Sequence, residues 1–385
     1  MSFEAFRTTL GGFSLNAAAA LLKEAGVPGL NAVSIASLFI GLFIGLFIAT
    51  VVHRWTGDEW DCTYVLGPSV KKDADLTAFI QALGRASLED LGAGMALLSL
   101  DPSATFPGDR DGRHQLIVRD FYPALFRRLQ QEPMWLLTGV PGTGKSWFIW
   151  YAMYQILQLP EPPAIVWQSH NYNALQRVLF KDGEAHIGDA TNFNEELGKP
   201  STWLFSDGIM PGYTKARAIL VSSPKRSIYK DWVKGRSCIE LTMPLWTWPE
   251  IVVTWQHLYS SNPQLSLDRV RRCFEDYYGG VPRQVLEEPS RRGDAARDDV
   301  VMRKALGCTN LKQVAAAAGG AYDSCPDAVH LIVHQDGDRS TFECLPCRFA
   351  TPRVADQFSQ QMLRMGLGAQ LAAYMVSAND ADAVL

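Results

Sequence analysis

The residue run with the most specific chemistry is Gly139-Val-Pro-Gly-Thr-Gly-Lys-Ser146, which matches the pattern GxxxxGK[ST]. Its glycines let the backbone approach an anion, and the backbone N–H groups can then point inward at that anion. Lys145 is the residue type that reaches the β- and γ-phosphates, and Ser146 is the type that binds Mg²⁺. The pattern predicts a site for ATP with magnesium, formed by Gly139, Val140, Pro141, Gly142, Thr143, Gly144, Lys145, Ser146 and Trp147.

A carboxylate that binds the same magnesium ion should follow a later strand of the same sheet. Asp207 closes the apolar run 203–206, so we expect Asp207 and Ser146 to bind the ion together. The alternative is an aspartate that forms a turn before Gly208. Many ATPases of this class carry a glutamate base directly after the aspartate, where this chain has Gly208. Binding is therefore better supported than hydrolysis, with Glu195 or Glu196 as substitute bases or, alternatively, surface carboxylates.

Two further side chains are candidates for sensing the γ-phosphate. Ser222 or Ser223 ends the next apolar run, where a polar residue can contact the phosphate, although a plain strand-end serine fits equally well. Arg283 follows Gly279-Gly-Val-Pro at the start of a helix and could reach the phosphates; a surface arginine is the alternative. The candidate catalytic set is thus Lys145, Asp207, Ser223 and Arg283.

The cysteines admit a second metal hypothesis. Cys344 and Cys347 have the CxxC spacing of zinc ligands, and Cys325, His330 and His334 lie upstream. A zinc ribbon normally brings a second such pair, so thiols in a small β-region are the competing interpretation. The seven cysteines are scattered and show no disulfide framework, which favours a reducing compartment.

The elements that must position these residues alternate between strands and helices. Apolar runs predict strands at 134–140, 164–169, 202–208, 218–223 and 238–243. Helical spacing predicts helices at 145–157, near 172–180 and near 228–234. This order predicts an α/β fold with a parallel sheet covered on both faces, of the additional-strand class of P-loop NTPases. The strand at 218–223 should then lie beside the strand that precedes the phosphate loop.

After residue 244 the pattern becomes helical. Thr247 with Glu250 forms a capping box for a helix over 247–259, and a second helix over 266–278 ends at Gly279. Residues 328–349 read as strand-rich and 354–376 as helical. We therefore expect these domains: an N-terminal region (1–60), a poorly defined module and linker (61–111), the NTPase core (112–244), a helical lid (245–290) and a small α+β module (291–385).

The N-terminal region contains an uncharged run, 33–52, that is long enough to span a bilayer as a helix. Its small residues recur every four positions, as in close helix pairs, which favours a membrane anchor with the NTPase in the cytosol. A buried hairpin helix is the alternative. The net charge of -4 gives no global attraction to nucleic acid.

Several segments together resemble the crinkler effectors of oomycetes and fungi, which are related to retrotransposon hot spot proteins. They are Leu136–Ser146, Ala164–Gln168, Thr202–Gly208, Ile219–Tyr229, Gly279–Glu287 and the lead-in Val118–Tyr122, within residues 112–360. The resemblance implies an ATPase module followed by a nuclease or kinase, in a secreted protein that acts inside host cells, often in the nucleus. Two features depart from it: the usual N-terminal header is not recognisable, and 290–385 shows no nuclease or kinase residue set.

The two functional hypotheses are therefore an ATPase that drives or regulates an effector activity and an ATP-bound scaffold that has lost hydrolysis. A host protein, a DNA target, a second copy of the chain and a membrane contacted through 33–52 are the partners left open.

Overall fold

The computed structural model describes residues 70–225, 227, 229–234, 238–294 and 296–370. The chain divides into two units, 1–68 and 69–385, and the described residues all belong to the second. The hydrophobic run 33–52 lies outside them. Within the described ranges, no helix combines the length and the apolar character needed to cross a membrane.

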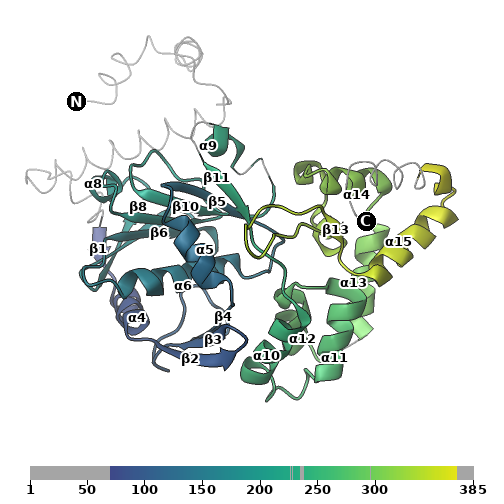
Figure 1. The fold of residues 1–385 in the computed structure, drawn as a ribbon, viewed down its shortest axis with the longest axis horizontal. Helices are drawn as coiled ribbons and strands as arrows, with labels where there is room; N and C mark the ends of the chain where they lie inside the picture. The colour runs from purple at the N-terminus through teal and green to yellow at the C-terminus, as the bar shows by residue number, and fades with distance from the viewer. Residues whose placement is uncertain (1–69, 226, 228, 235–237, 295, 371–385) are drawn as a thin grey trace, which may run out of the picture. The chain divides into compact units, whose positions relative to one another are not determined.

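One eight-stranded sheet forms the centre of the described unit (Figure 1), in the order β1-β8-β7-β6-β9-β10-β5-β11. Its strands are β1 (Val70–Lys72), β5 (Met134–Thr138), β6 (Ile165–Ser169), β7 (Gln176–Lys181), β8 (Glu184–Asp189), β9 (Trp203–Asp207), β10 (Arg217–Val221) and β11 (Ile239–Thr242). The pairings β6–β9, β9–β10, β10–β5 and β5–β11 are parallel. Strand β10 thus lies beside β5, the strand before the glycine-rich loop, as expected for 218–223.

The prediction of a parallel sheet was nevertheless wrong, because the sheet is mixed. The pairings β6–β7, β7–β8 and β8–β1 are antiparallel. The helix expected near 172–180 is instead a short turn of helix, α7 (His170–Asn173), followed by β7. Asp182 and Gly183 both have positive φ, 52° and 74°, which closes a two-residue hairpin between β7 and β8. An Asp-Gly pair is a hairpin signal, and it outweighed the weak helical spacing before it.

The two faces of the sheet are covered by different helices, because side chains alternate along each strand. In β5, Trp135 and Leu137 join the core under α4 (Ala74–Gly84), α5 (Tyr122–Leu129) and α6 (Lys145–Leu157). Leu136 packs on the other face with residues of α8 (Asn194–Leu197) and α9 (Lys230–Lys234). Figure 1 shows α4 and α6 below the strands, α5 in front of them and α9 above them.

Residues 61–111, for which the sequence indicated only a poorly defined module and a linker, form regular elements in their described part. Helix α4 packs on α6, and β1 extends the large sheet. A separate antiparallel sheet contains β2 (Ser87–Gly92), β3 (Met95–Ser99) and β4 (Gln115–Val118). The predicted linker 101–113 connects β3 to β4.

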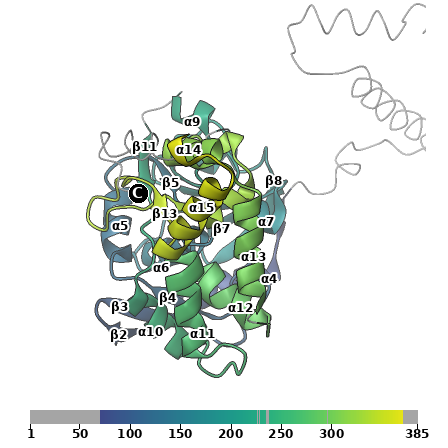
Figure 2. The same cartoon turned by 90° about the vertical axis from the view of Figure 1, so that its right-hand side faces the viewer.

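After β11 the described chain is mainly helical, as Figure 2 shows with these helices toward the viewer. Its elements are α10 (Trp248–Leu258), α11 (Leu267–Arg272), the π-helical turns η3 (Cys273–Tyr278) and η4 (Arg283–Glu287), α12 (Glu288–Arg291), α13 (Ala296–Gly307), α14 (Leu311–Ala318), the 3-10 turns η5 (Tyr322–Ser324) and η6 (Asp327–Leu331), strands β12 (Val333–His334) and β13 (Arg348–Phe349), and α15 (Pro352–Arg364). The capping box of Thr247 and Glu250 is confirmed.

The prediction that residues 328–349 are rich in strands was wrong. The segment contains η6 and one ribbon of two-residue strands, and other backbone groups form hydrogen bonds within its loops. Helix α15 starts at Pro352, with Thr351 as its N-cap, two residues before the expected start. Apolar residues of the expected lid and C-terminal module form one shared core, which includes Ile251 of α10 and Phe358 of α15. The described residues after 290 therefore pack against the preceding helices.

Candidate functional site

The glycine-rich loop joins β5 to α6 and lies against the segment 279–283. Gly142 has φ 93°, and a Cβ at this position would lie 2.7 Å from the Cβ of Arg283. The Arg283 backbone N–H donates to the Gly142 carbonyl at 3.4 Å. Residue 142 must therefore be glycine, both for its backbone conformation and for the close approach of Arg283. The predicted phosphate loop and the predicted sensor arginine are adjacent.

Lys145 is buried at the start of α6. Its Nζ donates to the carbonyls of Gly139 at 2.7 Å and Val140 at 2.9 Å. Burial and repulsion from Arg283 lower the pKa of Lys145 to about 7, against the opposing attraction of Asp207. No carboxylate pairs with Lys145 among the described residues. A buried ammonium group held only by carbonyls is well suited to exchange them for phosphate oxygens.

Asp207 ends β9, and its register partner at the end of β6 is Ser169. The Ser169 hydroxyl donates to Asp207 Oδ2 at 3.4 Å, and the Ser146 side chain also donates to this carboxylate. Burial raises the pKa of Asp207, while these hydrogen bonds and the charge of Lys145 counteract the rise. The structure thus brings Ser146 and Asp207 together. A hydroxyl and a carboxylate fit Mg²⁺, which takes few protein oxygens beside water and phosphate; the metal role itself stays a prediction.

The two candidate serines lie differently. The Ser222 hydroxyl is buried and has no hydrogen-bond partner among the described residues, whereas Ser223 is half-buried and lines a cavity. Arg283 is exposed, lines that same cavity and also borders a second one. Ser223 and Arg283 therefore reach the space beside the loop from the sheet and from the helical region.

The second cavity opens on the other side of Arg283, next to Gly142 and Gly144. Aromatic and apolar side chains line it, among them Ile117, Trp147, Trp246 and Tyr259. Arg113 lies over the Trp147 ring, 5.8 Å from its centroid. A cavity with several aromatic walls beside the loop has the character of a site for a nucleobase. Trp147 was predicted; Tyr259 and Arg113 come from distant segments that no motif linked to the loop.

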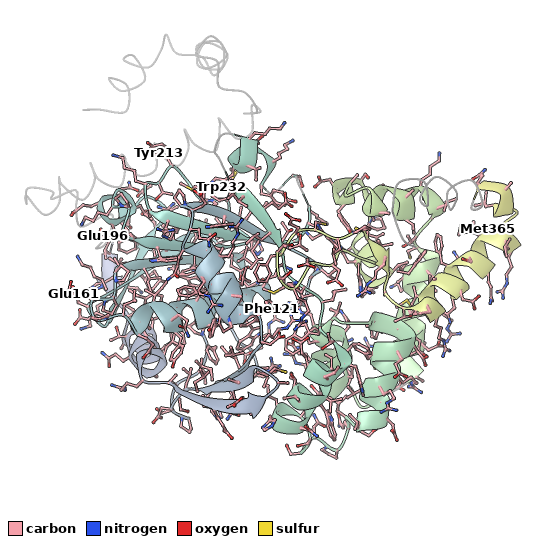
Figure 3. The ribbon with its side chains drawn as sticks, in the orientation of Figure 1. Phe121, Glu161, Glu196, Tyr213, Trp232 and Met365 are labelled. Carbon is pink, nitrogen blue, oxygen red and sulfur yellow. The ribbon has the colours of Figure 1, made fainter. Side chains whose placement is uncertain are left out.

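Arg119 is a structural residue that our sequence reasoning noted only as part of the lead-in Val118–Tyr122. It is fully buried and forms a bidentate pair with Glu250 of α10, Nε to Oε1 at 2.8 Å and Nη2 to Oε2 at 3.1 Å. Its guanidinium lies 4.6 Å from the Trp246 ring centroid, and the Trp246 indole donates to the Thr143 carbonyl at 2.8 Å. Figure 3 labels the neighbouring Phe121 where the sheet domain meets the helices. Arg119 thus links α10 to the loop.

We expect Arg119→Met to lower the free energy of unfolding by about 3–5 kcal/mol, because among the described residues it leaves the buried Glu250 carboxylate with the half-exposed Arg339 as its one cationic partner, beside the hydrogen bonds from Thr247. Urea denaturation followed by tryptophan fluorescence measures the change. The matched control is Arg119→Met with Glu250→Gln, which removes the charge as well and should lose less stability. Equal losses in both variants would contradict an ion-pair role.

Other sequence candidates lie away from the loop. Glu195 pairs with Lys199 at 2.9 Å, Glu196 lies 3.7 Å from Lys181, and neither lines the two cavities; Figure 3 shows Glu196 at the opposite edge from Phe121.

Within the described ranges, no group of three or more His, Cys, Asp or Glu could hold a metal ion. The zinc candidates instead interact separately: Cys325 with the Gln313 carbonyl and Cys347 with the Tyr322 hydroxyl.

Comparison with known proteins gives a partial relationship. No protein-family model matches the chain. It is 25% identical over 192 residues to Crinkler effector protein 15 of Phytophthora infestans, and the same figures hold for Crinkler effector protein 16. The similarity supports a crinkler-like relationship. The alignments cover 46% of this chain and 29% of each relative, so the chain spans less than a third of the length of the curated relatives that it matches.

Proposed function

We propose that this chain binds ATP with Mg²⁺ at the loop 139–146 and hydrolyses it, as the nucleotide-dependent part of a crinkler-like effector. The observation that carries the proposal is the convergence of Lys145, Asp207 and Arg283, three charged groups from separate elements that interact electrostatically beside a glycine cradle. Such convergence costs folding energy when no ligand is bound, which favours a binding role.

The described residues suggest how the nucleotide would be held. Lys145 and the loop N–H groups would bind the phosphates, and the start of α6 directs its positive end at them. The cavity with Trp147 and Tyr259, which Gly142 and Gly144 of the loop also line, would hold the base. Arg283 borders both spaces and would contact the phosphates from the side of the helices.

The chemistry would be attack of water on the γ-phosphate. Magnesium, when bound by Ser146 and Asp207, supplies positive charge that stabilises the phosphate oxygens. Lys145 and Arg283 would stabilise the negative charge that develops in the transition state. Ser223 would orient the γ-phosphate from the end of β10.

The second candidate is a nucleotide-bound scaffold without turnover. The specific observation for it is Gly208, with φ 70°, at the position after Asp207, so that no carboxylate follows the magnesium acid. In both cases we propose an effector role, which the relatives' names state for those proteins, and a site of action in a host cell and a relationship to retrotransposon hot spot proteins, which the crinkler resemblance implies. The partner would be a host protein, DNA, a second copy of the chain or, through 33–52, a membrane.

The test is an assay with the purified full-length chain. Calorimetry measures ATP binding with and without Mg²⁺, and release of labelled phosphate measures hydrolysis. Binding with Mg²⁺-dependent phosphate release supports the ATPase; binding without release supports the scaffold. Absence of binding at millimolar ATP would overturn both.

A further inference from the structure

The cavity that Ser223 and Arg283 line has a volume of about 410 Å³ and continues into the C-terminal residues. Pro141 of the phosphate loop forms one wall, and Asp327 and His330 of η6 form another. This is far more space than one water molecule of roughly 30 Å³ needs. The cavity can therefore hold a phosphate group together with an attacking water.

The imidazole of His330 is the unexplained group in this cavity. The residue is 8% exposed, and its ring stacks on Tyr322 with centroids 5.0 Å apart. Nδ1 is buried without a hydrogen-bond partner, and no hydrogen bond of the ring to a described residue exists. Nε2 is not among the buried nitrogens without a partner, so it is the ring nitrogen that can face the cavity. An imidazole that lacks partners in a cavity with charged and polar lining residues indicates a ligand that completes its hydrogen bonding.

We propose that His330 is the general base that accepts the proton of the water attacking the γ-phosphate. The inference rests on the proposed ATPase function. The water oxygen forms the new bond to the γ-phosphorus, and the bond between that phosphorus and the β–γ bridging oxygen breaks, with its electron pair leaving on ADP. The water proton passes to Nε2 of His330, and inorganic phosphate is the second product.

The pairing of the groups in the cavity favours His330 over Asp327 as the group that contacts the water. Burial and the charges of Lys225 and Lys145 lower the pKa of His330 to about 4, against the attraction of Asp327, so the imidazole is neutral near pH 7 and one ring nitrogen carries a lone pair. Asp327 is the only carboxylate among the described residues that line this cavity. Its carboxylate already binds Lys225 at 2.6 Å, whereas the His330 ring has no hydrogen bond to a described residue.

The position of His330 is held by contacts on both sides. Its neighbour His334 hydrogen-bonds to the His330 backbone. The Lys225–Asp327 pair and the Ser227 N–H bond to Asp323 at 2.9 Å connect the segment after β10 to the turns η5 and η6. The C-terminal residues thus supply a catalytic group to the loop from outside the expected NTPase core.

The experiment measures ATP binding and phosphate release for wild type, His330→Ala and His330→Asn. The control is His257→Ala, at an exposed position of α10. We expect both His330 variants to bind ATP with a Kd within about threefold of wild type and to hydrolyse it about 100-fold more slowly or worse. Added imidazole should restore part of the rate in His330→Ala, because the vacated cavity admits it, and should not affect His257→Ala.

Each outcome decides the inference. If wild type hydrolyses ATP and His330→Asn, folded by circular dichroism, does so at an equal rate, His330 is not the base and the ATPase proposal stands. If hydrolysis falls in folded His330→Ala without any rescue by imidazole, the histidine has a structural role and the inference fails. If wild type binds no ATP, the proposed ATPase function is refuted, and the role of His330 with it.

Discussion

Lys145→Ala should weaken ATP binding about 100-fold or more, because charged hydrogen bonds each contribute about 1.5–3 kcal/mol and Lys145 would make more than one to the phosphates. Without ligand the substitution removes a buried ammonium group that has only two carbonyl partners. The fold should therefore tolerate it, and the unfolding midpoint in urea should stay near the wild-type value. Calorimetric titration with Mg²⁺–ATP measures the loss of affinity.

The control for this variant is Lys199→Ala, which removes an exposed lysine that pairs with Glu195 on the surface. It should bind ATP as wild type does. The assignment of the loop 139–146 is overturned if Lys145→Ala and Lys199→Ala bind ATP with the same affinity.

Asp207→Asn should slow ATP hydrolysis about 100-fold or more, because the metal ion loses the charged ligand that fixes it against the γ-phosphate, and metal ions supply several kcal/mol to such transition states. ATP binding should change much less, since Lys145 and the loop N–H groups remain. The carboxamide preserves the size of the side chain and its acceptor for Ser169. Phosphate release at saturating ATP measures the rate, and calorimetry the affinity.

Asp231→Asn, on the exposed side of α9, is the matched control and should match wild type. A second observation specific to the metal is the Mg²⁺ concentration that gives half-maximal rate, which should rise in Asp207→Asn. If this variant hydrolyses ATP at the wild-type rate with an unchanged Mg²⁺ requirement, the carboxylate that binds Mg²⁺ is not Asp207.

Local sequence patterns predicted the parts of the site that lie within a few residues of one another. The glycine pattern located the loop between β5 and α6, and the apolar run before Asp207 located the end of β9. The capping box at Thr247 and the helix end at Gly279 were also local signals. These predictions succeeded because backbone conformation and capping depend on adjacent residues.

Tertiary structure decided the strand directions in the sheet and the contacts between residues far apart along the chain. The sheet became mixed because β7 and β8 form a hairpin, although neighbouring segments had suggested only parallel connections. Arg119 and Glu250 are 131 residues apart, and burial of both charges together is a property of packing that no spacing encodes. The same holds for Tyr259 beside the loop and for His330 in the cavity.

The amino-acid sequence by itself thus predicted which residues would carry phosphate chemistry, because residue type and local backbone define the pattern of a phosphate loop. It did not determine which distant groups complete the site. Whether His330 is an ordinary buried histidine or a neighbour of the loop depends on contacts between segments about 190 residues apart along the chain, which form only when one shared core brings the C-terminal turns against the preceding helices.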